Sequence, residues 1–407
     1  MAENLTNEEK RVVFYSEESQ PTISSGVNPE TPLSALNLNW REKDLPERER
    51  TKHVHRLHPY LGKFIPQLVE IFLRKYFKPG QTVFDPFGGS GTTLVQANEL
   101  GVNSIAYDIS AFNVMLMKAK TDRYELKRLK SEVEDILEKV NLETQTHTHQ
   151  LALWEREGKY EASNQSEYLA SWFAPQALNE LLSYRNLIDE YEYKNVLKVI
   201  LSRSARSSRL TTHFDLDFPK RPQTEPYWCY KHSRTCVPTE SAYKFLKRYS
   251  QDTIKRIEEY SLLRTNAEVS VFHGDSRYEP IPSIDGLITS PPYVGLIDYH
   301  EQHRYAYELL GLEDRRTNEI GPAEQGSSQK AKKTYQGDLV QVFANAMKSM
   351  KSGGYLIVVA GDRYGLYDYI AKESYVQIEA IVRRHVNRRT GRRSSEFYED
   401  VFVWRKS

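Results

Sequence analysis

Cysteine is scarce in this chain, with two among 407 residues, Cys229 and Cys236. So few cysteines exclude a disulfide scaffold, and we expect a reducing, cytoplasmic setting. No apolar run is long enough to span a membrane, and we find no signal peptide near Met1. An excess of charge of one sign is missing too, since 56 basic residues balance 55 acidic ones. Any surface that binds nucleic acid must therefore be local.

What the sequence does contain is a series of short apolar strands that alternate with helical stretches. This alternation predicts an α/β fold with a parallel sheet. A helix is expected to begin at Pro66 and to end before Lys78, Pro79 and Gly80, because proline and glycine mark its two ends. The expected strands are 82–85, 104–108, 269–275, 286–290 and 355–362, followed by a closing hairpin from "VQIEAIV" and "DVFVW".

The strand pattern is interrupted once, over residues 122–267, where the spacing of apolar residues favours helices. Residues 1–35 are polar and contain prolines and glycine, so we expect a loose arm there. We therefore divide the chain into an N-terminal arm (1–51), an α/β domain in two pieces (52–121 and 268–407) and a mostly helical insertion (122–267).

The segment "DPFGGSGTT" (85–93) joins an expected strand to an expected helix. Its glycines can take positive φ and let a ligand approach the helix N-terminus, although a tight structural turn is the alternative. A phosphate-binding loop is excluded because no lysine follows, and the dinucleotide fingerprint lacks its third glycine. Asp108 ends the next strand, 17 residues after Gly91. A carboxylate there suits two ribose hydroxyls; otherwise it caps the helix ahead of Ser110.

The segment "TSPPY" (289–293) follows another expected strand. Two prolines make a stiff corner, which presents the Ser290 hydroxyl and nearby carbonyl groups as hydrogen-bond acceptors. Tyr293 adds a flat aromatic face. Acceptors beside a ring suit a planar base with an exocyclic amine, which is a poor nucleophile because its lone pair is conjugated into the ring. A plain structural turn is the alternative.

Together, "DPFGGSGTT" and "TSPPY" resemble the S-adenosylmethionine-dependent amino-methyltransferases of DNA, which modify cytosine N4 or adenine N6. The resemblance implies a Rossmann-like class I methyltransferase sheet, S-adenosyl-L-methionine as cofactor and double-stranded DNA as substrate. It assigns catalysis to Ser290, Pro291, Pro292 and Tyr293. Serine in the first position points to N4-cytosine, because the adenine enzymes more often have Asp or Asn there. The residues to which it assigns cofactor binding are His58, Lys63, Phe64, Asp85, Pro86, Phe87, Gly88, Gly89, Gly91, Thr92, Asp108 and Asp275.

The order of the two motifs resembles the class in which the target-recognition region lies between them, so residues 122–267 are the candidate for reading DNA. A base inside a duplex must be flipped out to reach the corner. A cognate restriction endonuclease, paired in function without stable binding, is the usual setting of the family. Alternatives are N6-adenine methylation, methylation of RNA, or a nucleoside-binding regulator with an inactive corner. Methylation of cytosine C5 is excluded, because neither cysteine follows a proline.

Arginines gather in two segments, and they are candidates for contacts with DNA phosphates. The alternative is a solvated charged face, which is the usual role of such runs. The candidates are Arg203, Arg206, Arg209, Arg388, Arg389 and Arg392.

Cys229, His232 and Cys236 lie within eight residues of one another, which raises the question of a zinc site. Their spacing is not that of a standard zinc ribbon or finger, so two buried thiols and a polar histidine are the simpler interpretation. We expect no metal in the reaction, since methyl transfer needs none.

Overall fold

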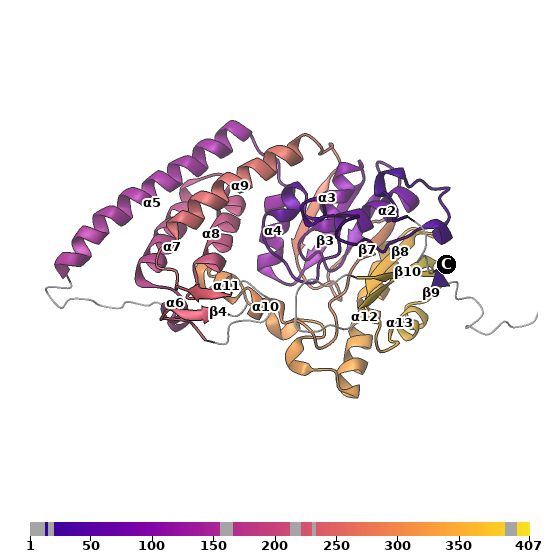
Figure 1. The fold of residues 1–407 in the computed structure, drawn as a ribbon. Helices are drawn as coiled ribbons and strands as arrows, with labels where there is room; N and C mark the ends of the chain where they lie inside the picture. The colour runs from indigo at the N-terminus through magenta and orange to yellow at the C-terminus, as the bar shows by residue number, and fades with distance from the viewer. Residues whose placement is uncertain (1–12, 15–19, 155–165, 212–220, 230–232, 387–396) are drawn as a thin grey trace, which may run out of the picture.

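The computed structural model describes residues 13–14, 20–154, 166–211, 221–229, 233–386 and 397–407. Within these residues the chain forms a central eight-stranded sheet and a separate two-stranded hairpin (Figure 1). The strands of the central sheet are β1 (Val13–Phe14), β2 (Thr82–Asp85), β3 (Asn103–Asp108), β6 (Val269–His273), β7 (Gly286–Thr289), β8 (Tyr355–Ala360), β9 (Val376–His385) and β10 (Tyr398–Lys406).

The strand order is β1-β9-β10-β8-β7-β2-β3-β6. Strands β6, β3, β2, β7 and β8 are mutually parallel, and β10 runs antiparallel to both β8 and β9. The chain builds outward from β2 to β6 and then starts again at β7, on the other side of β2. Such a switch point opens a crevice at the carboxyl ends of the two central strands. The predicted Rossmann-like sheet, its five parallel strands and its closing hairpin are confirmed.

Both faces of the sheet are buried, as expected of a parallel sheet covered by helices. Val83 and Ile288 pack in an apolar cluster with helix α2, whereas Phe84 and Leu287 pack in a second cluster with helix α12. Helix α2 begins at Pro66 and ends before Pro79, as predicted. The helices that flank the sheet are α2 (Pro66–Tyr76), α3 (Thr92–Glu99), α4 (Ala111–Thr121), α12 (Gln329–Ser349) and α13 (Tyr367–Glu373).

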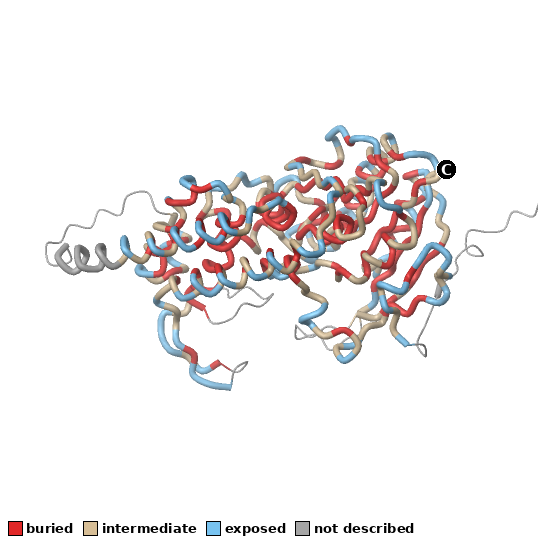
Figure 2. The backbone as a smooth tube through the Cα atoms, turned by 90° about the horizontal axis from the view of Figure 1, so that it is seen from above, coloured by how far each residue is buried: buried red, intermediate tan, exposed pale blue. Residues whose placement is uncertain are grey.

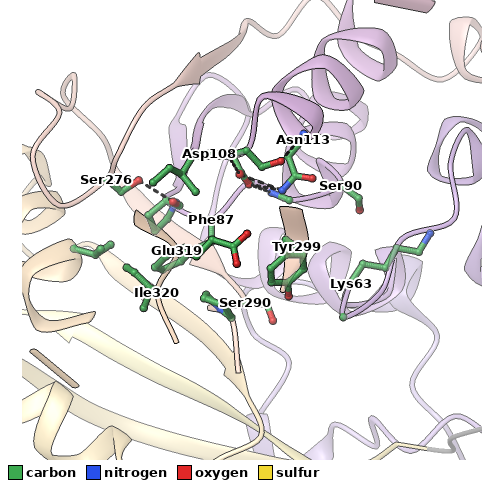
Figure 3. A pocket seen from close by; sticks show the side chains of 18 of the residues that line it. Lys63, Phe87, Ser90, Asp108, Asn113, Ser276, Ser290, Tyr299, Glu319 and Ile320 are labelled. Atoms are coloured by element: carbon green, nitrogen blue, oxygen red, sulfur yellow. Dashed lines mark hydrogen bonds between the residues drawn. The ribbon is translucent and has the colours of Figure 1, made fainter. Parts of the chain in front are cut away.

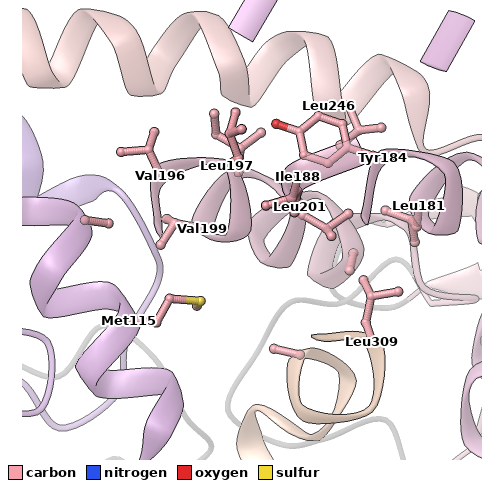
Figure 4. Close-up of a cluster of buried hydrophobic side chains, with 14 of the residues drawn as sticks. Met115, Leu181, Tyr184, Ile188, Val196, Leu197, Val199, Leu201, Leu246 and Leu309 are labelled. Atoms are coloured by element: carbon pink, nitrogen blue, oxygen red, sulfur yellow. The ribbon is translucent and has the colours of Figure 1, made fainter. Parts of the chain in front are cut away.

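The insertion is mostly helical, as predicted, and it has an apolar core of its own (Figure 4). That core is continuous with the α/β domain, because Met115 of α4 and Leu309 of α11 (Arg304–Leu310) belong to the same cluster as Leu197 and Leu201 of α8 (Lys194–Ser208). Buried residues therefore run through both parts of the molecule (Figure 2). The elements of the insertion are α5 (Leu126–Trp154), α6 (Glu167–Trp172), α7 (Pro175–Leu187), α8 (Lys194–Ser208), α9 (Tyr243–Ser261) and the hairpin β4 (Tyr227–Cys229) and β5 (Arg234–Cys236).

The remaining elements are short. They are α1 (Glu47–Arg50), α10 (Tyr299–Gln302) and α11 (Arg304–Leu310), together with the 3-10 helices η1 (Ser24–Gly26), η2 (Leu33–Ala35), η3 (His53–Arg56), η4 (Ile188–Glu190), η5 (Arg316–Asn318) and η6 (Ala323–Gln325). Across the described part of the chain, no helix has the length and hydropathy that a membrane span requires.

The expectation of a loose arm is wrong for the parts of it that the structure describes, residues 13–14, which form β1 beside β9, and residues 20–35. Val27 and Leu33 pack in the cluster that covers α2, next to the buried Leu36. The Ser24 hydroxyl also donates a hydrogen bond to Glu70 on α2, at 3.0 Å. Apolar residues scattered in a polar segment therefore anchor it along one edge of the α/β domain.

Candidate active site

The site lies where β2 and β7 end side by side. The Thr289 hydroxyl, at the end of β7, donates a hydrogen bond of 2.6 Å to Oδ1 of Asp85, at the end of β2. Both side chains are at least 99% buried. This single contact joins the glycine loop to the proline corner, although the two residues are 204 positions apart in the chain. Asp85 therefore supports the pocket from behind and does not line it.

One pocket is lined by both motifs (Figure 3). The glycine loop contributes Gly88 and Gly89, and the proline corner contributes Ser290 and Pro292. The predicted residues that line it are Lys63, Phe64, Pro86, Phe87, Gly88, Gly89, Thr92, Asp108, Asp275, Ser290 and Pro292. The predicted residues that do not are His58, Asp85, Gly91, Pro291 and Tyr293.

The glycine loop needs its glycines for two reasons. Gly89 and Gly91 have φ of 49° and 78°, the left-handed region that favours glycine. Gly88 has no room for a side chain, because a Cβ there would collide with Met117 of α4. The loop connects the end of β2 to the start of α3, and Gly88 and Gly89 line the pocket without side chains.

Asp108 is held in the pocket wall by backbone donors. Its Oδ2 accepts from Gly89 N at 2.7 Å, and its Oδ1 accepts from Ser110 N at 2.8 Å. Burial raises the pKa of Asp108, although these two backbone hydrogen bonds act to lower it. The cap of helix α4 is Ser110 itself, whose hydroxyl accepts from Asn113 N. Because Ser110 caps the helix, Asp108 need not serve as the cap, and its carboxylate is explained better as part of the pocket wall.

Asn113 completes this wall, and it was not predicted from the sequence. Its Nδ2 donates to both carboxylate oxygens of Asp108 at 3.1 Å, whereas its Oδ1 is buried without a hydrogen-bond partner. A buried acceptor beside a carboxylate fits a ligand that carries two adjacent hydroxyl donors. The ribose of a nucleoside is such a ligand.

The opposite end of the pocket carries a lysine. Lys63 Nζ donates to the carbonyl oxygen of His55 at 3.0 Å, and burial lowers the pKa of Lys63 to about 8. His58 lies in the same segment but points elsewhere. Its Nε2 lies 3.2 Å from the Ser202 hydroxyl and 3.3 Å from the Tyr305 hydroxyl, so its ring joins the segment to the helical insertion.

The proline corner is fixed from outside the pocket. The Pro292 carbonyl accepts a hydrogen bond of 2.8 Å from the Tyr335 hydroxyl. The Tyr293 hydroxyl donates to Glu399 at 2.7 Å, and Arg384 donates to the same carboxylate at 2.9 Å. Tyr293 consequently lines a second cavity beside the first, together with Asp362, Arg363, Tyr364, Tyr367, Phe397 and Tyr398.

Two more aromatic residues and an acid complete the pocket. The rings of Tyr60 and Tyr299 stack at 5.8 Å between centroids, and the Tyr60 hydroxyl accepts from Asn113 Nδ2 at 3.1 Å. Glu319, which directly follows η5, lines the pocket as well and accepts from His300 N at 2.9 Å. Tyr60 lies between the predicted residues His58 and Lys63. Tyr299, the first residue of α10, and Glu319 were not predicted from the sequence.

The arginines predicted to contact DNA have different surroundings. Arg203 is 91% buried, and its Nη1 donates to Asp252 at 2.6 Å. Arg209 is 96% buried and lies over the ring of Tyr305. This burial disfavours phosphate contacts by these two residues. Arg206 is half-buried. Arg388, Arg389 and Arg392 lie outside the described residues, and so does His232 of the zinc hypothesis; Cys229 and Cys236 are buried thiols.

Comparison with known proteins identifies the family. A family model described as DNA methylase matches residues 4–119. The type II methyltransferase M.MjaII of Methanocaldococcus jannaschii is 37% identical over 88% of this chain and 81% of its own length. M.MvaI of Kocuria varians is 26% identical, over 64% of this chain and 55% of that protein. M.BsoBI of Geobacillus stearothermophilus is 25% identical, over 68% of this chain and 57% of that protein.

Solved structures align less closely. The crystal structure of TrmN from Thermus thermophilus covers 85% of this chain and 50% of that chain, with 12% identity and a TM-score of 0.32. The assignment rests on the sequence relatives, above all on the match over four fifths of M.MjaII. The chain belongs to the S-adenosylmethionine-dependent DNA amino-methyltransferases of the N4/N6 family, with type II enzymes as its relatives.

Proposed function

We propose that this enzyme transfers the methyl group of S-adenosylmethionine to the exocyclic N4 amine of cytosine within a specific double-stranded DNA sequence. The observation that carries the proposal is the neutral hydroxyl of Ser290 in the first position of the proline corner, inside the pocket that the glycine loop lines. Ser290, unlike the Asp or Asn that is more usual in the adenine enzymes, is the residue expected of an N4-cytosine enzyme.

On the acceptor side, Ser290 and the Pro291 carbonyl are proposed to accept hydrogen bonds from the amine. Two acceptors favour the pyramidal, more nucleophilic geometry of nitrogen. The Pro292 carbonyl already accepts from Tyr335, so its role is to hold the corner rigid. Because Tyr293 is tied to Glu399, its ring keeps one orientation and can offer a face to the flipped base in the second cavity.

On the donor side, S-adenosylmethionine supplies an activated methyl group on sulfur. The residues present fit that molecule: Asp108 and the unpartnered Asn113 Oδ1 suit its ribose, and Gly88 and Gly89, which have no side chains, let it approach the backbone of the loop. Lys63 is placed to attract its carboxylate, and Asp275 to contact its adenine region. The nitrogen–carbon bond forms as the carbon–sulfur bond breaks, and the surplus amine proton leaves to water.

The division of labour along the chain follows from this assignment. We propose that 52–121 and 268–407 carry catalysis, after an N-terminal segment of 1–51, and that the insertion 122–267 reads the DNA. Flipping the target cytosine out of the duplex is expected to cost a few kcal/mol. A cognate restriction endonuclease remains a prediction from the family.

The experiment that tests the proposal is nucleoside analysis. DNA from cells that express the protein is digested to nucleosides and separated by liquid chromatography with mass detection, beside DNA from cells that express Ser290→Ala. We expect N4-methylcytosine that is lost in the variant. Methylated adenine in place of methylated cytosine would overturn the base assignment, and methylation of RNA alone would overturn the substrate.

A further inference from the structure

A second group of polar side chains lies outside the methyl-transfer site, where η3 meets helix α3. Among the residues that the structure describes, His53, His55 and Glu99 each bring a ligand atom to within 4.8 Å of the others. His53 Nε2 lies 2.9 Å from Glu99 Oε1, and Gln96 Nε2 lies 3.1 Å from His55 Nε2. We call these four residues the histidine cluster.

The histidine cluster contains buried polar atoms that have no hydrogen-bond partner among the described residues. They are His53 Nδ1, His55 Nδ1 and Gln96 Oε1, whereas His53 Nε2 is paired with Glu99 Oε1. His53 is 96% buried and His55 is 99% buried. One such atom costs about 1–3 kcal/mol when it is left without a partner. Several in one place indicate a partner that the polypeptide itself does not supply.

The donor set indicates the chemistry of that partner. The two imidazole rings and the carboxylate each bring a ligand atom to within 4.8 Å of the others, so one ion can contact all three side chains. Two imidazoles and a carboxylate are ligands that Zn²⁺ and related divalent ions prefer.

We propose that the histidine cluster binds a divalent transition-metal ion through His53, His55 and Glu99. Gln96 Oε1, or a water molecule, completes a four-coordinate site. In the structure the Gln96 amide places Nε2 at 2.7 Å from Glu99 Oε1 and at 3.1 Å from His55 Nε2. Binding an ion therefore requires this amide to turn over, which brings Oε1 to the ion in place of Nε2.

The surrounding charges allow such an ion. Lys52 Nζ binds Glu99 Oε2 at 2.8 Å, which leaves the Oε1 side of the carboxylate toward the histidines. Two more lysines lie near His55, and each amine donates to a backbone carbonyl, Lys120 Nζ to Ser90 O and Lys63 Nζ to His55 O, so both are directed away from the three ligand side chains. Glu259 adds negative charge near His53.

The ion would act on structure, at a distance from the reacting atoms. His53 stacks on Tyr260 of α9 at 5.3 Å between centroids, so the site joins η3, α3 and the last helix of the insertion. The carbonyl oxygen of His55 accepts the hydrogen bond of Lys63, which lines the cofactor pocket. A bound ion would therefore position Lys63 through His55. This assignment does not depend on which base is methylated.

The test is metal binding by the full-length protein. Cys229 and Cys236 could also bind zinc, so the experiment uses Cys229→Ser/Cys236→Ser as its background. Zn²⁺ is added to protein stripped with a chelator, excess metal is removed, and bound metal is measured by plasma mass spectrometry. We expect one Zn²⁺ per chain, a higher midpoint of thermal unfolding with Zn²⁺ than without it, and a Co²⁺ spectrum typical of four-coordinate nitrogen and oxygen ligands.

Variants locate the site. Glu99→Gln and His55→Gln should weaken Zn²⁺ binding at least about tenfold, which corresponds to roughly 1.4 kcal/mol. His273→Gln, at a half-buried histidine beside Glu313, should leave it unchanged. Circular dichroism confirms that each variant is folded. No stoichiometric Zn²⁺ in the background protein would overturn the proposal, without need of any histidine variant. Equal Zn²⁺ affinity in His55→Gln and the background would overturn it as well.

Discussion

The α/β domain and the helical insertion are held together by different forces. At the active site, polar contacts join residues that are far apart in the chain, as between Thr289 and Asp85 or between Tyr335 and Pro292. In the insertion, a large apolar cluster holds the helices together, and this cluster extends to Met115 of the α/β domain. Hydrogen bonds are directional and place atoms, whereas apolar burial is non-directional and mainly stabilises.

The comparison predicts that chemistry and stability can be changed separately. Substitutions in the proline corner should lower methyl transfer with little effect on the free energy of unfolding. Substitutions in the core of the insertion should do the reverse. The predictions below are ordered from the largest expected effect to the smallest.

Ser290→Ala should reduce the rate of methyl transfer by about 10²-fold or more, because a positioned hydrogen-bonding group at the reacting nitrogen is lost. The measurement is single-turnover transfer of labelled methyl groups to duplex DNA at saturating cofactor. The matched control is Ser352→Ala, at an exposed serine in the turn before β8, on the side of the sheet where the parallel strands begin and outside both the pocket and the insertion. A Ser290→Ala enzyme with wild-type rate would show that the corner does not hold the amine.

Leu201→Ala should destabilise the protein by about 2–5 kcal/mol, because Leu201 is fully buried in the shared core and the substitution leaves a cavity. Denaturant unfolding monitored by circular dichroism measures the effect. Leu262→Ala, at a leucine that is 86% exposed, should change stability by less than about 0.5 kcal/mol. If Leu201→Ala instead slowed methyl transfer without loss of stability, the proposed separation would fail.

Lys63 should make cofactor affinity sensitive to pH. Because burial lowers the pKa of Lys63 to about 8, its ammonium is present below that pH and is lost above it. If the ammonium binds the cofactor carboxylate, the affinity should fall as pH rises through about 8, where an ordinary lysine would stay charged. Isothermal titration at several pH values measures this. Lys63→Met has no ammonium at this position and serves as the reference. If its cofactor affinity depended on pH in the same way as that of the wild type, a role of Lys63 in binding the cofactor carboxylate would be excluded.

Tyr335→Phe should give the smallest effect. It keeps the ring but removes two contacts of the hydroxyl, the hydrogen bond to the Pro292 carbonyl and the one shared with the Tyr367 hydroxyl at 2.9 Å, each a change of about 1 kcal/mol. We expect a rate of methyl transfer that is lowered less than about tenfold, with unchanged cofactor affinity. Weakened cofactor binding in this variant would mean that the corner and the glycine loop are more tightly coupled than the structure indicates.

The parts of the site that were predictable are contiguous in sequence. The glycine loop and "TSPPY" each place several site residues within a few positions, and strand context puts both at the same edge of the sheet. Asn113, Tyr299 and Glu319 escaped prediction because their roles depend on how α4, α10 and the segment after η5 fold against that edge. No local pattern marks them.

Two expectations, the DNA-contacting role of Arg203 and the loose N-terminal arm, disagree with the structure for the same physical reason. Arg203 lies in a basic, serine-rich segment, but its partner Asp252 is 49 residues away on α9 and draws it into the interior. The segment before Leu36 is polar in composition, yet Val27 and Leu33 suffice to fix it on α2. Composition describes a segment on its own, whereas burial depends on what folds against it.

The central claim is that the donor loop and the acceptor corner form one site with two separable sides. The most direct measurement compares cofactor dissociation constants and single-turnover rates for Asp108→Ala and Ser290→Ala. Asp108→Ala should weaken cofactor binding by about tenfold or more, through loss of charge-assisted hydrogen bonds. Ser290→Ala should keep cofactor binding within about twofold of wild type and lose the rate at saturating cofactor. Unchanged cofactor affinity in Asp108→Ala, or a rate that survives in Ser290→Ala, would contradict the account.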